Sequence, residues 1–153
     1  MVFLGLLVVV FGVCVAMAIE GISFFMFIAP SALVMTIFVP FGGALMTYRP
    51  REIWDAFMAV FGGGVDVKRE DRITYADFFS MLSRYAMNAG GLAVVLGVVQ
   101  VLRFIGVAQS NHEDVNIGMI AGGAALGLIG LLYGILFNFL YDCMRRKMDR
   151  PAA

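Results

Sequence analysis

The fold is decided by residues 115–141, which read VNIGMIAGGAALGLIGLLYGILFNFLY and contain no Asp, Glu, Lys or Arg. An α-helix rises about 1.5 Å per residue, so about 20 apolar residues cross the hydrocarbon layer of a bilayer. This run of 27 residues is therefore long enough to form one membrane-spanning helix.

Three other stretches also lack these four residue types, namely residues 1–19, 21–48 and 85–102. A helix satisfies its own backbone hydrogen bonds in lipid, and no alternating strand pattern suggests a barrel. The sequence therefore predicts an all-α polytopic membrane protein, with residues 1–153 forming a single membrane domain. Its four transmembrane helices are expected at about residues 2–19, 21–48, 85–107 and 115–141.

The overall composition agrees with this prediction. The chain is 61% hydrophobic and 14% charged, with a mean hydropathy of +0.91, whereas soluble domains are about 45–50% apolar and about 25% charged. Such a composition excludes a soluble enzyme domain, a disordered chain and a nucleic-acid binder. No enzyme signature is present, so we expect neither catalysis nor a cofactor.

The basic residues predict the topology. By the positive-inside rule, residues 49–84 and the C-terminal tail face the cytoplasm, so both termini are cytoplasmic (N-in, C-in). Arg103 is the one basic residue placed outside. The ten placed inside are Arg49, Arg51, Lys68, Arg69, Arg72, Arg84, Arg145, Arg146, Lys147 and Arg150.

The residues that bind metals elsewhere give only a weak signal here. Cys14 and Cys143 are predicted at different membrane depths, which disfavours a disulfide. His112, Glu113 and Asp114 are interpreted as a solvated turn rather than a metal site, because the spacing typical of metal ligands is absent. We therefore expect no metal.

The cytoplasmic segment 49–84 is predicted to form short amphipathic helices. Pro50 suits the first turn of a helix that runs to about Phe61. Thr74 is predicted to cap a second helix that runs into the third span. The first helix either lies along the inner membrane surface or forms a docking surface for another protein. Its apolar face is expected to contain Ile53, Trp54, Phe57, Met58 and Phe61.

Small residues at helical spacing mark the contact faces of membrane helices, because lipid tails are as apolar as leucine. The fourth span carries Gly123, Gly127, Gly130, Gly134 and Asn138, and the third carries Ala86, Gly90, Ala93, Gly97 and Gln100. These stripes either pack the two spans together or line a seam or pore that admits another helix. In the second run, Pro30 and Pro40 are candidate kinks, with Pro30 expected close to the helix start.

Residues 6–60 contain a short hairpin, then a proline followed by a helix rich in small residues, then a basic turn into a cytoplasmic helix, and residues 86–103 read AMNAGGLAVVLGVVQVLR. In order and spacing these segments resemble the N-terminal helix pair and the third span of MotA-type flagellar stator subunits, which belong to the MotA/TolQ/ExbB family. Residues 117–142, which include GLIGLLYGILFNFLYD, resemble the fourth span, where a Leu-Tyr-Gly and a following Asn recur. The resemblance covers roughly four-fifths of the chain, and four spans favour the MotA branch.

The resemblance implies a bacterial inner-membrane homo-oligomer, a pentamer, around two helices of a MotB-like (TolR- or ExbD-like) single-span partner. The third and fourth spans would form the inner ring, and the partner's membrane Asp would carry the proton or sodium ion. The residues expected to face the pore or partner are Gly123, Gly127, Gly130, Leu131, Gly134, Asn138, Ala86, Gly90, Ala93, Gly97 and Gln100.

Three departures from the family pattern affect the functional prediction. Leu131 stands where the family places a Thr facing the partner's Asp, and Met87 stands where it places a Pro. Leu131 offers no oxygen to an ion, so either another oxygen substitutes, such as a backbone carbonyl at Gly130, or conduction is altered or lost. Residues 49–84 are also too short for the cytoplasmic domain that engages the flagellar rotor.

The leading hypothesis is therefore a ring-forming subunit that couples ion flow to movement of a partner helix, outside the standard flagellar rotor. The alternative is a non-conducting oligomeric membrane scaffold of the same fold. A small-molecule transporter is disfavoured because no internal repeat with a polar midplane site is visible.

Overall fold

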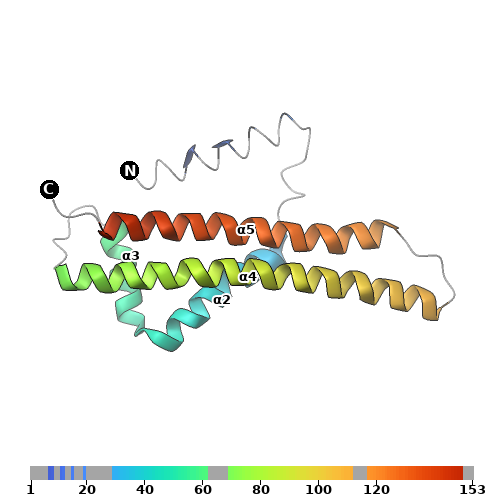
Figure 1. Cartoon of the computed structure of the whole chain (residues 1–153), viewed down its shortest axis with the longest axis horizontal. Helices are drawn as coiled ribbons and strands as arrows, with labels where there is room; N and C mark the ends of the chain where they lie inside the picture. The colour runs from blue at the N-terminus through green and yellow to red at the C-terminus, as the bar shows by residue number, and fades with distance from the viewer. Residues whose placement is uncertain are drawn as a thin grey trace.

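The computed structural model describes residues 7, 8, 11, 12, 15, 19, 29–61, 69–111 and 117–149. The regular structure in these residues is helical, which confirms the all-α prediction for this part of the chain (Figure 1). The described residues leave out most of the predicted first span and residues 21–28 of the second span. They also leave out Cys14 and residues 112–114. The predicted first span, at about residues 2–19, therefore stays a prediction.

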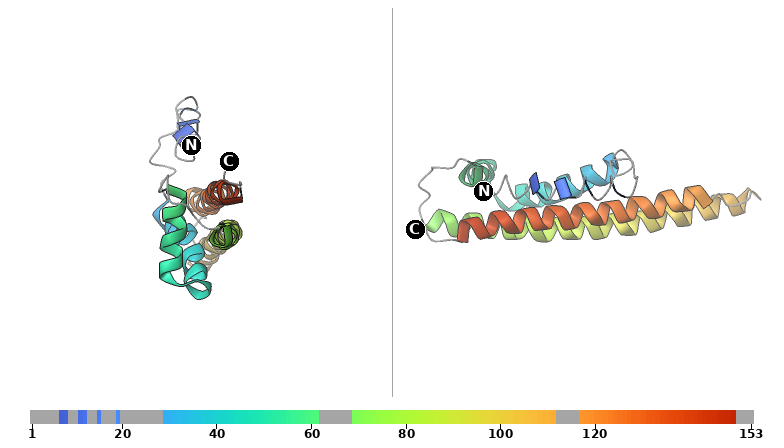
Figure 2. Two further views of the ribbon diagram at one scale, coloured as in Figure 1. Left: turned by 90° about the vertical axis from the view of Figure 1, so that its left-hand side faces the viewer. Right: turned by 90° about the horizontal axis from the view of Figure 1, so that it is seen from above.

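The two longest helices form an antiparallel pair. α4 (Arg69–Ser110) has 42 residues and α5 (Ile117–Asp149) has 33, which correspond to lengths of about 63 and 50 Å. They lie side by side along most of their length in Figures 1 and 2. Each is longer than the hydrocarbon layer of about 30 Å.

Three of the described helices are long and apolar enough to cross a membrane: α2 (Pro30–Thr47), α4 and α5. Soluble domains rarely expose so many large apolar side chains, and here they extend along all three helices. These features identify the chain as a membrane protein.

The ends of α2 and α3 (Pro50–Phe61) follow local rules. Ala29 is extended and Pro30 is the first residue of α2, a position where the missing N–H of proline leaves no bond unmade. Pro50 opens α3 in the same way, and the Glu52 carboxylate accepts a hydrogen bond of 2.9 Å from the Arg49 backbone N–H. The predicted bounds of α3 are confirmed.

The predicted start of the next helix at Thr74 is wrong. α4 begins at Arg69 and continues unbroken to Ser110, so the third span and the segment before it form one helix. The Thr74 hydroxyl donates to the Glu70 carbonyl at 3.3 Å, as threonine does inside a helix. Glu70 and Asp71 in the first turn favour the earlier start because they complement the helix dipole.

α3 lies across the α4–α5 pair. In the left view of Figure 2 the pair is seen end-on, whereas α3 is seen from its side. Such a helix would lie in the membrane plane if the pair stood along the membrane normal. Only part of the predicted apolar face is buried. Ile53 is buried, together with Ala56 and Val60, while Trp54, Met58 and Phe61 are exposed.

Aromatic side chains fill the core between α3, the end of α2 and the first half of α4. The Phe57 ring meets the rings of Phe78 and Phe79 edge-on, with centroids 5.9 and 5.6 Å apart, and Tyr48 meets Phe78 at 5.2 Å. Phe79 is fully buried. This core holds α3 and the end of α2 against the start of α4.

We expect Phe79→Ala to lower the free energy of unfolding by about 3–5 kcal/mol, because it removes a large buried ring. Trp54→Ala is the control, since Trp54 is 67% exposed and its loss should change stability by about 0.5 kcal/mol or less. Unfolding in detergent micelles, followed by circular dichroism, measures both. Equal losses would contradict the described core.

Candidate functional site

α4 and α5 meet backbone to backbone along a line of glycines. A Cβ added to Gly97 would lie 2.7 Å from the Gly123 carbonyl oxygen and 2.9 Å from the Gly127 Cα. A Cβ added to Gly134 would lie 2.8 Å from the Gly90 Cα. These separations are too short for any side chain, so glycine is required at these positions.

The structure thus brings the two predicted stripes together and packs them against each other. Within this chain they pack the third and fourth spans together, and no space is left between α4 and α5 for another helix. The residues predicted to face a pore or partner that lie in this contact are Gly123, Gly127, Gly130, Gly134, Ala86, Gly90, Ala93 and Gly97.

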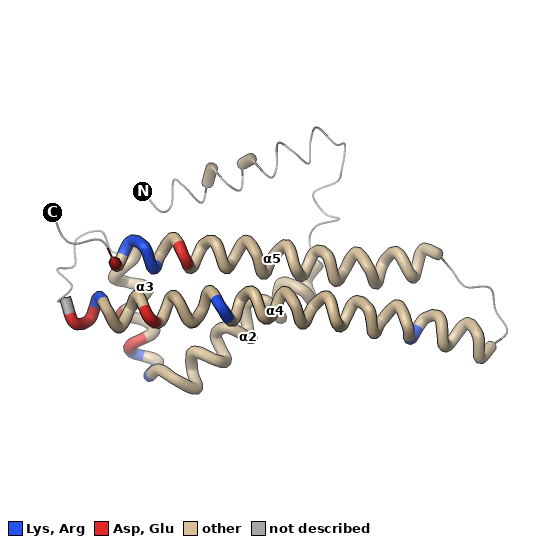
Figure 3. The backbone as a smooth tube through the Cα atoms, in the orientation of Figure 1, with Lys and Arg blue, Asp and Glu red and all other residues tan. Residues whose placement is uncertain are grey.

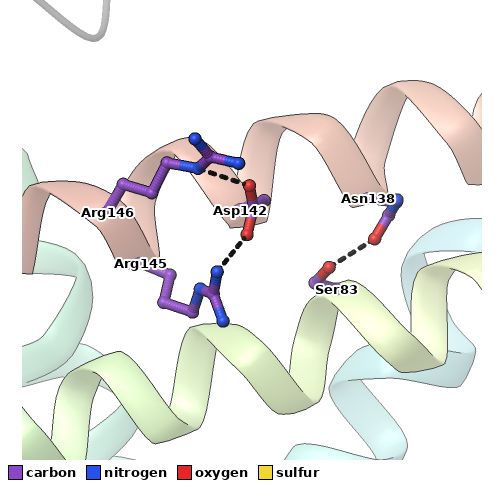
Figure 4. A network of polar contacts seen from close by, with 5 residues as sticks. All are labelled: Ser83, Asn138, Asp142, Arg145 and Arg146. Carbon is purple, nitrogen blue, oxygen red and sulfur yellow. Dashed lines mark hydrogen bonds and ion pairs between the residues drawn. The ribbon is translucent and has the colours of Figure 1, made fainter. Parts of the chain in front are cut away.

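The remaining predicted site residues are half-buried. The Ser83 hydroxyl donates a hydrogen bond to the Asn138 side-chain oxygen. This bond joins α4 to α5 close to Asp142 and Arg145 (Figure 4). Gln100 is half-buried and makes no side-chain hydrogen bond to a described residue. Leu131 is half-buried, and its Cα lies 3.4 Å from a Cβ added to Gly90.

A third line of buried residues, on α2, escaped the sequence analysis. Ala32, Thr36, Pro40 and Ala44 are all buried and are spaced by four residues, the same spacing that identified the other stripes. A Cβ added to Gly130 would lie 3.6 Å from the Ala32 Cβ, so α2 also packs near the glycine line. The Thr36 hydroxyl donates to the Ala32 carbonyl at 2.7 Å.

The two prolines of α2 have different roles. Pro30 starts the helix, so it has no preceding turn to bend. Pro40 lies inside α2 and is fully buried. Its ring provides no N–H, so the Thr36 carbonyl lacks the usual helical donor.

α2 and α3 cover only one face of the α4–α5 pair. On that face a Cβ added to Gly43 of α2 would lie 2.6 Å from the Tyr85 ring, and Lys147 of α5 donates to the Val60 carbonyl of α3. None of the helices α2 to α5 covers the opposite face, which we call the open face (Figure 2, left).

The open face contains an apolar groove of about 390 Å³. The groove exists because Gly97 and Gly127 contribute no side chain to its floor. Leu131 lies one turn along α5 from Gly127 and Leu128, so it lies on the same side of that helix. The groove is lined by Val94, Gly97, Val98, Val101, Leu102, Ile120, Ala124, Gly127 and Leu128.

Most of the charged residues lie at one end of the α4–α5 pair, which we call the charged end (Figure 3). There Asp142 pairs with Arg145 at 2.9 Å and with Arg146 at 2.7 Å, within α5 (Figure 4). The Tyr75 pKa is raised, first by burial and then by the carboxylates of Asp71, Asp55 and Glu52.

The described residues contain no cluster of three His, Cys, Asp or Glu side chains that could hold a metal ion.

Comparisons with protein-family models, curated proteins and solved structures found no match.

We expect Gly97→Ala to destabilise the α4–α5 pair by about 1–3 kcal/mol, because the new methyl group meets backbone atoms of α5. Gly91→Ala is the matched control on the same helix. A Cβ there meets nothing within 4 Å, so higher helix propensity should leave stability unchanged or raise it by up to about 1 kcal/mol. Thermal unfolding in micelles compares the two variants. If Gly97→Ala were as stable as Gly91→Ala, the described contact would be wrong.

Proposed function

We propose that this chain is a membrane subunit of the MotA/TolQ/ExbB type. It forms a pentameric ring in the bacterial inner membrane around a MotB-like single-span partner, and it couples proton or sodium flow to rotary or mechanical work. The observation that carries this proposal is that, among the described helices, α2 and α3 cover only one face of the α4–α5 pair. A subunit with an inner layer of two helices, an outer layer on one face and an open opposite face is suited to line a ring.

In this arrangement the glycine stripes hold the inner layer together rather than touching the partner. The partner helix then lies against the open face, where the groove and Leu131 are found. α2 belongs to the outer layer, as the family resemblance implies. The glycines were predicted from the sequence to face the partner. In this arrangement their neighbours, about a quarter turn around each helix, face the partner instead.

The lack of ionisable residues supports a carrier supplied by the partner. Residues 30–47, 85–102 and 117–141 contain no Asp, Glu, Lys or Arg, so an ion that crosses here needs a carboxylate from another chain. The gathering of charges at one end supports a topology in which that end faces the cytoplasm. Within residues 49–84 the described helices are α3 and the first part of α4, and a segment of this length is too short for the domain that engages a flagellar rotor.

One observation favours the alternative, a non-conducting scaffold with the same fold. Leu131 lies on the open side of α5 and offers no oxygen to replace the water shell of an ion. In the scaffold the ring and its partner are retained, but no ion passes.

The ring is tested by native mass spectrometry of the chain released from lipid nanodiscs. We expect five copies per particle. A monomer, or any other stoichiometry, would contradict the ring geometry.

Conduction is tested in vesicles that contain the chain and a candidate single-span partner with an Asp in its membrane helix. We expect proton or sodium flux that disappears when the partner's Asp is changed to Asn. The matched variant Leu131→Thr restores a hydroxyl and should increase flux. Absence of flux under either gradient, with and without Leu131→Thr, would favour the scaffold.

A further inference from the structure

Arg84 is a cation on the flank of α4 without a counter-ion among the described residues. It is exposed, and it forms no ion pair or hydrogen bond with a described residue. By contrast, Arg145 and Arg146 share the Asp142 carboxylate. The guanidinium of Arg84 is therefore available to an anion from outside the chain.

Arg84 lies deeper than the level at which α2 ends. Tyr48, which follows α2, packs on Phe78 with ring centroids 5.2 Å apart, so these residues mark the same depth. Arg84 is six residues further along α4, which is about 9 Å away from the charged end. The hydrogen bond from Ser83 to Asn138 places Arg84 level with the last apolar turns of α5. A charge at the edge of the apolar layer is costly unless it is paired or reaches the interface.

The residues that follow Arg84 along this flank change from polar to apolar. Asn88 is exposed one turn deeper and makes no side-chain hydrogen bond to a described residue, and Gly91 comes next, with open space where a Cβ would lie. Val95 and Leu102 continue the line, 57% and 62% exposed. The steps of 4, 3, 4 and 7 residues keep all five positions on one side of the helix.

We propose that this flank of α4 binds an anionic phospholipid of the leaflet at the charged end. Arg84 pairs with the headgroup phosphate, and the Asn88 amide donates to an ester carbonyl of the glycerol unit, about one helical turn deeper. Gly91 leaves room for the glycerol region, and the acyl chains lie along Val95. The order of groups along the helix matches the order of groups in the lipid.

A carboxylate on a protein partner is the competing anion, and the observations favour the lipid. A lipid accounts for the cation, the deeper amide and the uninterrupted apolar line together, whereas a carboxylate accounts for the cation alone. An anionic headgroup is preferred over a zwitterionic one because choline would repel the guanidinium. This proposal does not rest on the proposed function, since the flank is present in a single chain.

The test is native mass spectrometry of the delipidated protein titrated with phosphatidylglycerol or phosphatidylcholine. We expect the wild type to bind phosphatidylglycerol about fivefold more tightly, the effect of one basic residue at an anionic surface. Arg84→Gln should abolish this preference, and Arg84→Lys should retain most of it. Arg103→Gln is the matched control, because Arg103 is also exposed on α4 but lies near its other end. Circular dichroism checks that each variant is folded.

A second measurement identifies the occupant in the membrane. A photoreactive residue at Val95, whose side chain is 57% exposed on this flank, should yield an adduct with the mass of a phospholipid and leaves Gly91 unchanged. An adduct with a second copy or with another protein would overturn the proposal. Retention of the lipid preference in Arg84→Gln, or its equal loss in Arg103→Gln, would also overturn it.

Discussion

α4 and α5 meet backbone to backbone, because Gly90, Gly97, Gly127 and Gly134 leave no side chains between them. In lipid no hydrophobic effect draws two apolar helices together, so close packing and polar contacts must hold them. The glycine line provides the packing, and the Ser83–Asn138 hydrogen bond adds a polar contact. This contact fixes which sides of the two helices face each other, and thereby which sides remain for α2, α3 and any partner.

Local chemistry made part of the fold predictable. The absence of charge over long runs identified the apolar segments, and Pro50 fixed the start of α3. Spacing identified the small residues of α4 and α5 as a contact surface. Spacing alone could not say what the surface contacts, because a stripe of glycines fits a neighbouring helix of the same chain and a helix of another chain equally well. Packing within the chain resolved that ambiguity.

Other features depended on tertiary contacts that a single sequence does not display. Thr74 has a residue type suited to a helix cap, but α4 had already started at Arg69. α3 buries Ala56 and exposes Trp54, because small residues let this helix approach the aromatic core closely. The line through Thr36 and Pro40 was missed, since proline was considered only as a helix breaker. Arg84 was predicted to be one of the cytoplasmic charges. Its position deeper along α4 than the end of α2 follows only from the contact between Tyr48 and Phe78.

The order of synthesis gives the Thr36 hydrogen bond a further consequence. α2 leaves the ribosome before the residues that cover its buried side exist, since Ala32 packs near Gly130, about a hundred residues later. At 5–20 residues per second, Ala32 waits in the bilayer for about 5–20 s before Gly130 is made. During this wait the Thr36 hydroxyl needs no external partner, because it donates to the Ala32 carbonyl of its own helix. The newly synthesised α2 can therefore remain in the bilayer, with the Thr36 hydroxyl hydrogen-bonded, until α5 is inserted.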